Sequence, residues 1–330
     1  MNQVKLSVII CTHNRADLLP VLLESLAQQA LDAGQREILL VDNASTDNTR
    51  KIMDEFFVKI PGLRYIYEAE IGLSAARNRG WREAQGTYVG YLDDDCKAPP
   101  EWLSVAAEIV DKITPEVFGG PYYAFYNTPK PKWFKDEYGS HVQGETARPL
   151  NRNEYLSGGN MFIQRDLFES LGGFQHNLGM AGKQIAYGEE THFLIQLRTH
   201  DPKAILYYEP RLFVYHLVRA EKMNLRITPR RFFYRGRYSY RVFSQPEKQR
   251  QFHLIVSILR TLIRFFRACI WILYTLARIV KACTWGVITR NRVEYPFIEN
   301  YIYECGFSRF VDLGQQIEAL CQILSLNEQD

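Results

Sequence analysis

The chain has 330 residues, of which 46% are apolar and 23% are charged, and this composition is typical of a globular protein with one large or two modest domains. Its net charge of +3 is too small to indicate nucleic acid as a partner. Six cysteines without a CxxC pair, and a first segment without the pattern of a secretory signal, predict a cytosolic protein whose six thiols are all free.

The first part of the chain alternates between strand and helix patterns. Four short, mostly apolar runs are predicted strands: residues 6–12, 37–41, 63–67 and 87–92. Three stretches between them are predicted helices: residues 17–30, residues 45–59 with Ser45 as the N-cap, and residues 74–84. This alternation predicts an α/β fold with a mostly parallel sheet flanked by helices.

Polar side chains follow each predicted strand at its carboxyl end, which is the edge of an α/β sheet where ligands bind. They are Thr12 to Arg15, Asp42 and Asn43, Glu68, and Asp93 to Asp95. Because three consecutive carboxylates repel one another, the last run indicates either a bound divalent cation or a solvated acidic turn. The chain has neither GxGxxG after the first strand nor GxxxxGK[ST], which disfavours a dinucleotide-binding fold and a P-loop.

Six segments resemble, in the same order, the motifs of family 2 glycosyltransferases, which are inverting enzymes with a GT-A fold. The segments are SVIICTHNRADLL, LLVDNASTDNT, IGLSAARNRG, YLDDDC, YLSGGNMFIQRDLFESLGGF and YGEETHFLIQLR. The resemblance implies transfer of a sugar from a nucleotide diphosphate sugar, expected to be a UDP-sugar, to a hydroxyl group. The implied acceptor is a saccharide or lipid-linked molecule in cell-surface or exopolysaccharide synthesis.

The resemblance also implies a domain organisation. Residues 1–240 would form the GT-A domain, with a nucleotide-binding half at 1–95 and an acceptor half at 96–240. Residues 241–330 would form a C-terminal α-helical extension. The alternative function is that of a catalytically idle relative, which would act as a membrane-associated scaffold in a polysaccharide synthase complex.

Roles for individual residues follow from the same resemblance. Asp93, Asp95 and His216 would hold Mn²⁺ or Mg²⁺, and the imidazole favours Mn²⁺, unless His216 is an ordinary core or surface histidine. The residues expected to bind the nucleotide sugar are Thr12, Asn14, Arg15, Asp42, Arg77, Asn78, Asp93, Asp94, Gly159 and Asn160. Arg77 would either face the diphosphate or pair with a neighbouring acidic side chain.

The general base is expected in the acidic pair Glu189-Glu190, where the family has Asp at the second position. Glu190 would remove the proton of the acceptor hydroxyl, but the extra methylene leaves open which of the two faces the acceptor. Both acids would also favour a helix N-terminus without any catalytic role. Two aromatic residues, Trp133 and Phe134, either stack on an acceptor sugar or anchor a loop.

Residues 250–290 form a predicted basic amphipathic helix. Its longest uncharged apolar run, residues 268–277, is too short to cross a bilayer. Five basic residues lie within about 100° of one another on the helix: Arg260, Arg264, Arg267, Arg278 and Lys281. We expect the segment to lie on the inner face of the plasma membrane, or else to pack on the catalytic domain or within a homo-oligomer.

Overall fold

The computed structural model describes residues 4–182, 186–225, 227–243, 261–274, 277, 303, 309–319 and 321. The chain divides into two compact units. The α/β unit comprises Met1–Phe125, Asp136–Gln184 and Glu189–Val218. The helical unit comprises Tyr126–Lys135, Ile185–Gly188 and Arg219–Asp330.

The α/β unit is built on an eight-stranded sheet with the strand order β3-β2-β1-β4-β9-β6-β10-β8. The first four strands of this order, β3, β2, β1 and β4, are parallel to their neighbours, and β6 is parallel to β10. Strand β9 is antiparallel to both β4 and β6, and β8 is antiparallel to β10. The strands are β1 Leu6–Thr12, β2 Arg36–Asp42, β3 Leu63–Tyr67, β4 Tyr88–Leu92, β6 Val117–Gly119, β8 Arg148–Pro149, β9 Asn160–Gln164 and β10 Leu206–Tyr208. The expected mostly parallel α/β fold is therefore confirmed.

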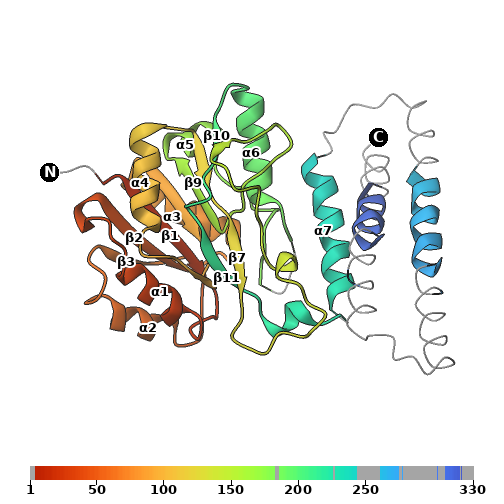
Figure 1. Cartoon of the computed structure of the whole chain (residues 1–330), viewed down its shortest axis with the longest axis horizontal. Coiled ribbons are helices and arrows are strands. Elements are labelled where there is room, and N and C mark those ends of the chain that lie inside the picture. The colour runs from red at the N-terminus through yellow and green to blue at the C-terminus, as the bar shows by residue number, and fades with distance from the viewer. Residues whose placement is uncertain are drawn as a thin grey trace. The chain divides into compact units, whose positions relative to one another are not determined.

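Helices cover both faces of this sheet, because alternate residues of its buried strands point to opposite sides (Figure 1). Leu6, Val8 and Ile10 of β1 pack with α1, α2 and α4, whereas Ile9 packs with α3, α5 and α6. The helices are α1 Leu19–Ala27, α2 Thr49–Phe56, α3 Leu73–Glu83, α4 Trp102–Lys112, α5 Asp166–Leu171 and α6 Glu189–His200, with short 3₁₀ turns η1 Ala33–Gln35 and η2 Asp136–Tyr138.

One predicted helix start is wrong. Helix α2 begins at Thr49, with Asn48 at the N-cap position, rather than at Ser45. The Ser45 hydroxyl instead accepts a hydrogen bond from the Asn14 backbone N–H, and the Ser45 N–H donates to Asp42 Oδ1. The residues between β2 and α2 therefore form a loop that is tied to the end of β1.

A second, three-stranded sheet has the order β5-β11-β7. Its strands are β5 Cys96–Lys97, β7 Tyr122–Phe125 and β11 Val214–Leu217. Strand β11 is antiparallel to β5, with His216 opposite Cys96, and it is parallel to β7, with His216 opposite Ala124. This register brings His216 beside the carboxylates that precede β5.

The helical unit contains η3 Ala220–Met223, α7 Thr228–Phe243 and the helical residues 261–274 and 309–319. Trp133 and Phe134 are buried and contact the ring of Tyr303. These contacts agree with the expectation that the two residues anchor a loop. No helix among the described residues is long and apolar enough to cross a membrane. Three predicted stripe residues lie outside the described residues: Arg260, Arg278 and Lys281.

The cysteine thiols that the structure describes are free, as the sequence predicted. They are Cys11, Cys96, Cys269 and Cys321. The remaining two, Cys283 and Cys305, lie outside the described residues.

Candidate metal and nucleotide-sugar site

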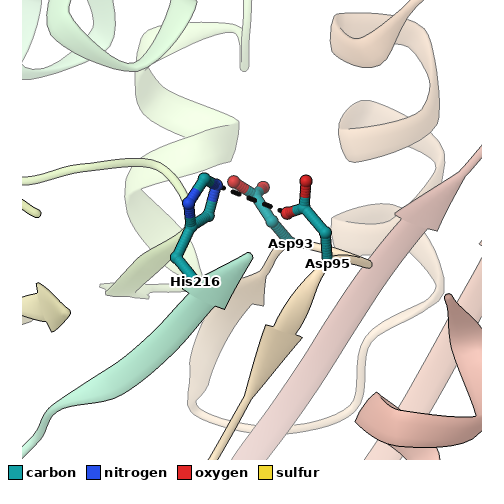
Figure 2. Close-up of side chains that lie close together, drawn as sticks. All are labelled: Asp93, Asp95 and His216. Atoms are coloured by element: carbon teal, nitrogen blue, oxygen red, sulfur yellow. Dashed lines mark ion pairs between the residues drawn. The ribbon is translucent and has the colours of Figure 1, made fainter. Parts of the chain in front are cut away.

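Three potential metal ligands come together from two elements of the α/β unit. Asp93 and Asp95 lie between β4 and β5, and His216 lies on β11. Each offers one ligand atom, and these atoms all lie within 4.8 Å of one another (Figure 2). His216 Nε2 is 3.4 Å from Asp95 Oδ1 (Figure 2). Two carboxylates and an imidazole are a donor set that suits Mn²⁺ and also accommodates Mg²⁺.

The middle carboxylate of the acidic run, Asp94, has partners at the end of β1. Asp94 is 2% exposed and accepts hydrogen bonds from Thr12 Oγ1 at 2.9 Å and Arg15 Nη1 at 2.5 Å. Burial raises the pKa of Asp94 above its usual range, and the Arg15 guanidinium opposes this shift. Arg15 therefore offsets part of the repulsion among the three acids, and Asp94 ties the end of β1 to the Asp93–Asp95 turn.

Arg77 of α3 is buried at the centre of the site, with 3% of its surface exposed. Its Nη1 lies 2.5 Å from Glu189 Oε1, its Nη2 lies 3.6 Å from Asp93 Oδ1, and Nη2 also donates to the Gly158 carbonyl at 3.2 Å. The guanidinium thus pairs with two acidic side chains, and its contact with the diphosphate stays a prediction. Through this pairing it connects the metal-binding turn with the start of α6.

The consecutive glycines Gly158 and Gly159 give these side chains the space that they occupy. A Cβ on Gly158 would lie 2.8 Å from Arg77 Nη2, and one on Gly159 would overlap the Asp93 carboxylate. The glycine pair therefore allows the backbone at Gly158 and Gly159 to lie close to the side chains of Arg77 and Asp93.

The two acids at the start of α6 have different surroundings. Glu189 is 5% exposed and pairs with Arg77. Burial, together with the adjacent Glu190 charge, raises the pKa of Glu189, and Arg77 opposes the shift. The Oε2 atom of Glu190 is also buried, but it forms no hydrogen bond within the described part of the chain. One carboxylate is engaged by a cation, and the other keeps an oxygen available for a proton.

The loops after β1 and β2 form the edge on which a nucleotide is expected. Asp42 is 2% exposed, and it accepts hydrogen bonds from Tyr65 Oη at 2.7 Å and from the Ser45 N–H at 2.9 Å. The Asn14 side chain accepts a bond from the Thr46 N–H at 2.7 Å. Sequence reasoning missed Tyr65, and its alternation along β3 was the only available signal that it faces Asp42.

Two of the residues expected to bind the donor have hydrogen-bond partners within the protein. Asn78 is 1% exposed and exchanges hydrogen bonds with the Phe174 backbone at 2.7 and 2.8 Å. Asn160 is fully buried, donates to the Pro121 and Leu212 carbonyls, and accepts from Trp102 Nε1 at 3.0 Å. The side-chain amides of both residues therefore hold loops of the α/β unit together.

Several solved structures share this fold. Mannosyltransferase PcManGT from Pyrobaculum calidifontis, in complex with GDP-Man and Mn²⁺, aligns with a TM-score of 0.54 and 16% identity over 98% of this chain and 76% of that one. S. aureus TarS 1–349, in complex with UDP-GlcNAc, aligns with a TM-score of 0.53 and 20% identity over 76% of this chain and 69% of that one. These likenesses support the GT-A fold.

Curated proteins are also similar in sequence. The succinoglycan biosynthesis protein ExoM of Rhizobium meliloti is 23% identical over 238 residues, which are 72% of this chain and 74% of ExoM. Glycosyltransferase AglE of Haloferax volcanii is 27% identical over 177 residues, which are 53% of this chain and 58% of AglE. The chain thus spans less than two thirds of AglE.

The family model described as "Glycosyl transferase family 2" matches residues 7–172, just over half of the chain. The chain belongs to glycosyl transferase family 2.

Proposed function

We propose that the protein is an inverting, metal-dependent glycosyltransferase that moves a sugar from a nucleotide diphosphate sugar to an acceptor hydroxyl. The observation that carries the proposal is the convergence of Asp93, Asp95 and His216, whose ligand atoms lie within 4.8 Å of one another. Solved proteins of the same fold bind UDP-GlcNAc and GDP-Man, which supports a nucleotide-sugar donor. We expect a UDP-sugar here.

Asp93, Asp95 and His216 would hold Mn²⁺ or Mg²⁺. When bound, such a cation would neutralise charge on the diphosphate as it leaves. The side-chain exposure of these residues is graded, from 6% for Asp95 through 15% for His216 to 36% for Asp93. Asp95 and His216, the more buried residues, would therefore hold the cation in place. Asp93, the most exposed of the three, would face the donor.

The nucleotide would lie along the loops that follow β1 and β2. Asp42 keeps its carboxylate oriented through Tyr65 and Ser45, and it would accept hydrogen bonds from the base or its ribose. Arg15 has 38% of its side chain exposed beside Asp94, so its guanidinium would reach a phosphate oxygen without giving up that pairing.

Glu190 would act as the general base. Because Glu189 is engaged by Arg77 and the Glu190 Oε2 atom has no partner among the described residues, Glu190 is the acid better placed to accept a proton. A hydroxyl deprotonated by Glu190 would attack the sugar carbon on the side opposite the leaving diphosphate, which inverts the anomeric configuration.

Thermal unfolding with a panel of nucleotide sugars, with and without Mn²⁺, tests the donor site. A donor at a hundred times its dissociation constant is expected to stabilise the protein by about 2.7 kcal/mol, a shift of a few degrees. We expect the shift for one nucleotide class only, dependent on Mn²⁺, lost in Asp95→Ala and kept in the surface control Asp54→Ala. If no donor shifts the wild type, or if Asp95→Ala responds as the wild type does, the proposal is wrong.

We further propose that the protein works on a membrane surface, where a lipid-linked acceptor would be available. In helical residues 261–274 the small side chains Thr261 and Ala268 are buried at 8% and 5% exposure. Large apolar side chains point outward with exposures of 51% to 66%: Ile263, Phe266, Ile270, Leu273 and Tyr274. This arrangement is the reverse of that in a helix that packs its apolar face inward, and it suits a lipid surface.

Charge supports an anionic lipid surface as the partner. Arg264 and Arg267 are exposed on the same helix, beside the outward apolar side chains. Each would add about 1 kcal/mol of attraction at an anionic leaflet.

Flotation with vesicles of phosphatidylcholine alone, or with added phosphatidylglycerol, tests the membrane proposal. We expect binding to the anionic vesicles, loss of binding in the double variant Phe266→Glu with Leu273→Glu, and unchanged binding in the control Val21→Glu with Val58→Glu, which places the same charges on exposed apolar sites of the α/β unit. Binding by the helix variant equal to wild type contradicts the proposal. A wild-type dimer that the helix variant converts to a monomer, without vesicle binding, would assign the face to a second copy instead.

A further inference from the structure

The imidazole of His216 packs against an aromatic ring of the neighbouring strand. Tyr122 is the first residue of β7, and it lies opposite Val214 in the parallel pairing of β7 with β11. Because side chains alternate along a strand, His216, two residues after Val214, lies on the same face of the small sheet as Tyr122. The centroids of the two rings are 5.0 Å apart and the ring planes meet at 40°, which is a favourable geometry for such a pair. Tyr122 therefore restricts the rotation of the His216 ring.

Tyr122 is held in turn by residues 136–143, which line the edge of the small sheet at β7. The Tyr122 N–H donates to the His141 carbonyl at 3.2 Å, and the His141 N–H donates to the Tyr122 carbonyl at 2.9 Å. The two rings also stack, with centroids 5.6 Å apart and planes 27° apart. Two residues further along β7, the Ala124 N–H donates to Ser140 Oγ at 2.9 Å. The backbone and the ring of Tyr122 are thus both fixed by this loop.

The loop is anchored to the eight-stranded sheet through Gln143. The Gln143 N–H donates to Tyr208 Oη of β10 at 3.1 Å. Its side-chain Nε2 lies 3.2 Å from His141 Nε2, and an amide nitrogen can only donate, so His141 Nε2 accepts this bond. A series of contacts therefore runs from β10 through this loop to the ring that packs on His216. Every residue in the series belongs to the α/β unit.

We propose that Tyr122 is a positioning residue, which holds the His216 imidazole toward the cation that Asp93 and Asp95 would share. This inference rests on the proposed metal-dependent transfer, and Tyr122 would act through His216 rather than by touching the cation. A histidine ring that rotates freely loses conformational entropy when it binds a metal. The packing of Tyr122 on the ring removes part of that freedom beforehand, as groups that orient metal ligands do in general.

The variant Tyr122→Leu tests the proposal, because it keeps an apolar side chain and removes the ring. We expect the dissociation constant for Mn²⁺ to rise about 10-fold, measured in titrations followed by the electron paramagnetic resonance signal of free Mn²⁺. Tyr122→Phe retains the ring and should bind as the wild type does. Tyr123→Leu is the matched control, since this neighbouring ring lies on the opposite face of the sheet and contacts Phe213.

A double-mutant cycle separates a role through His216 from a general loss of structure. In the His216→Ala background, Tyr122→Leu should cause no further loss of Mn²⁺ affinity. Pulsed electron paramagnetic resonance of bound Mn²⁺ should detect a histidine nitrogen in the wild type and in Tyr122→Phe, and a weaker nitrogen signal in Tyr122→Leu. If Tyr122→Leu does not fold, His141→Leu, which removes the ring stacked on Tyr122, must weaken Mn²⁺ binding in the same His216-dependent way.

Three results would contradict the account at different points. The inference is overturned if the wild type and Tyr122→Leu bind Mn²⁺ equally well. It is also overturned if Tyr122→Leu loses as much affinity in the absence of the His216 imidazole as in its presence, because the ring would then act by another route. Failure of the wild type itself to bind Mn²⁺ would contradict the proposed metal site, and the role of Tyr122 with it.

Discussion

At the scale of single residues, the adjacent acids of α6 differ because successive helical side chains point about 100° apart. Glu189 turns toward Arg77, and that buried pair orients the first turn of α6 beside Asp93. The Oε2 atom of Glu190 forms no hydrogen bond within the described residues. We therefore propose that Glu189 supports the structure of the site and that Glu190 accepts the proton.

The variant Glu190→Gln is expected to lower kcat by about 10²- to 10⁴-fold, because the amide cannot accept the acceptor's proton. Donor affinity, measured by thermal shift, should stay at the wild-type value. Glu190→Asp, which restores the residue type that the family carries, should keep much more activity than Glu190→Gln.

Glu189→Gln provides the contrast. It removes one acidic partner of the buried Arg77, and we expect a loss of about 3 kcal/mol in the free energy of unfolding, measured with denaturant. If Glu189→Gln abolished transfer with unchanged stability, while Glu190→Gln remained active, the two roles would have to be exchanged.

At the scale of elements, the long apolar strands were predictable and the short ones were not. Strand β1 was predicted with its observed ends, because a strand buried on both faces reads as one apolar run. Strands β5, β7 and β11 contain two to four residues, too few for a periodic pattern. The proximity of His216 to the acidic run was therefore available only from the family resemblance, since it depends on pairing between distant segments.

The motif residues also show what a sequence pattern leaves open. The side-chain amides of Asn78 and Asn160 bond to buried backbone groups, and their contact with the donor stays a prediction. The Asp93 carboxylate lies where a Cβ on Gly159 would be, and contact between Gly159 and the donor stays a prediction. A motif marks where a fold requires certain residue types, and only the three-dimensional contacts separate support of the site from contact with the substrate.

At the scale of the whole molecule, the parts of the site come from segments far apart in the chain. The acidic turn, Arg77, the start of α6 and β11 are brought together within the α/β unit. The amphipathic pattern of residues 250–290 was visible in the sequence, but it fitted both a membrane and a protein partner. The outward apolar side chains of residues 261–274 are the observation on which we base the membrane proposal.

The measurement that tests the account most directly is a proton NMR time course of the purified protein with Mn²⁺, the nucleotide sugar that binds, and a lipid extract as acceptor. We predict a new anomeric signal with the configuration opposite to that of the donor, formed by the wild type and absent with Asp95→Ala and Glu190→Gln. A product that retains the donor configuration would contradict the role of Glu190 as the base, and turnover by Asp95→Ala at the wild-type rate would contradict the metal site.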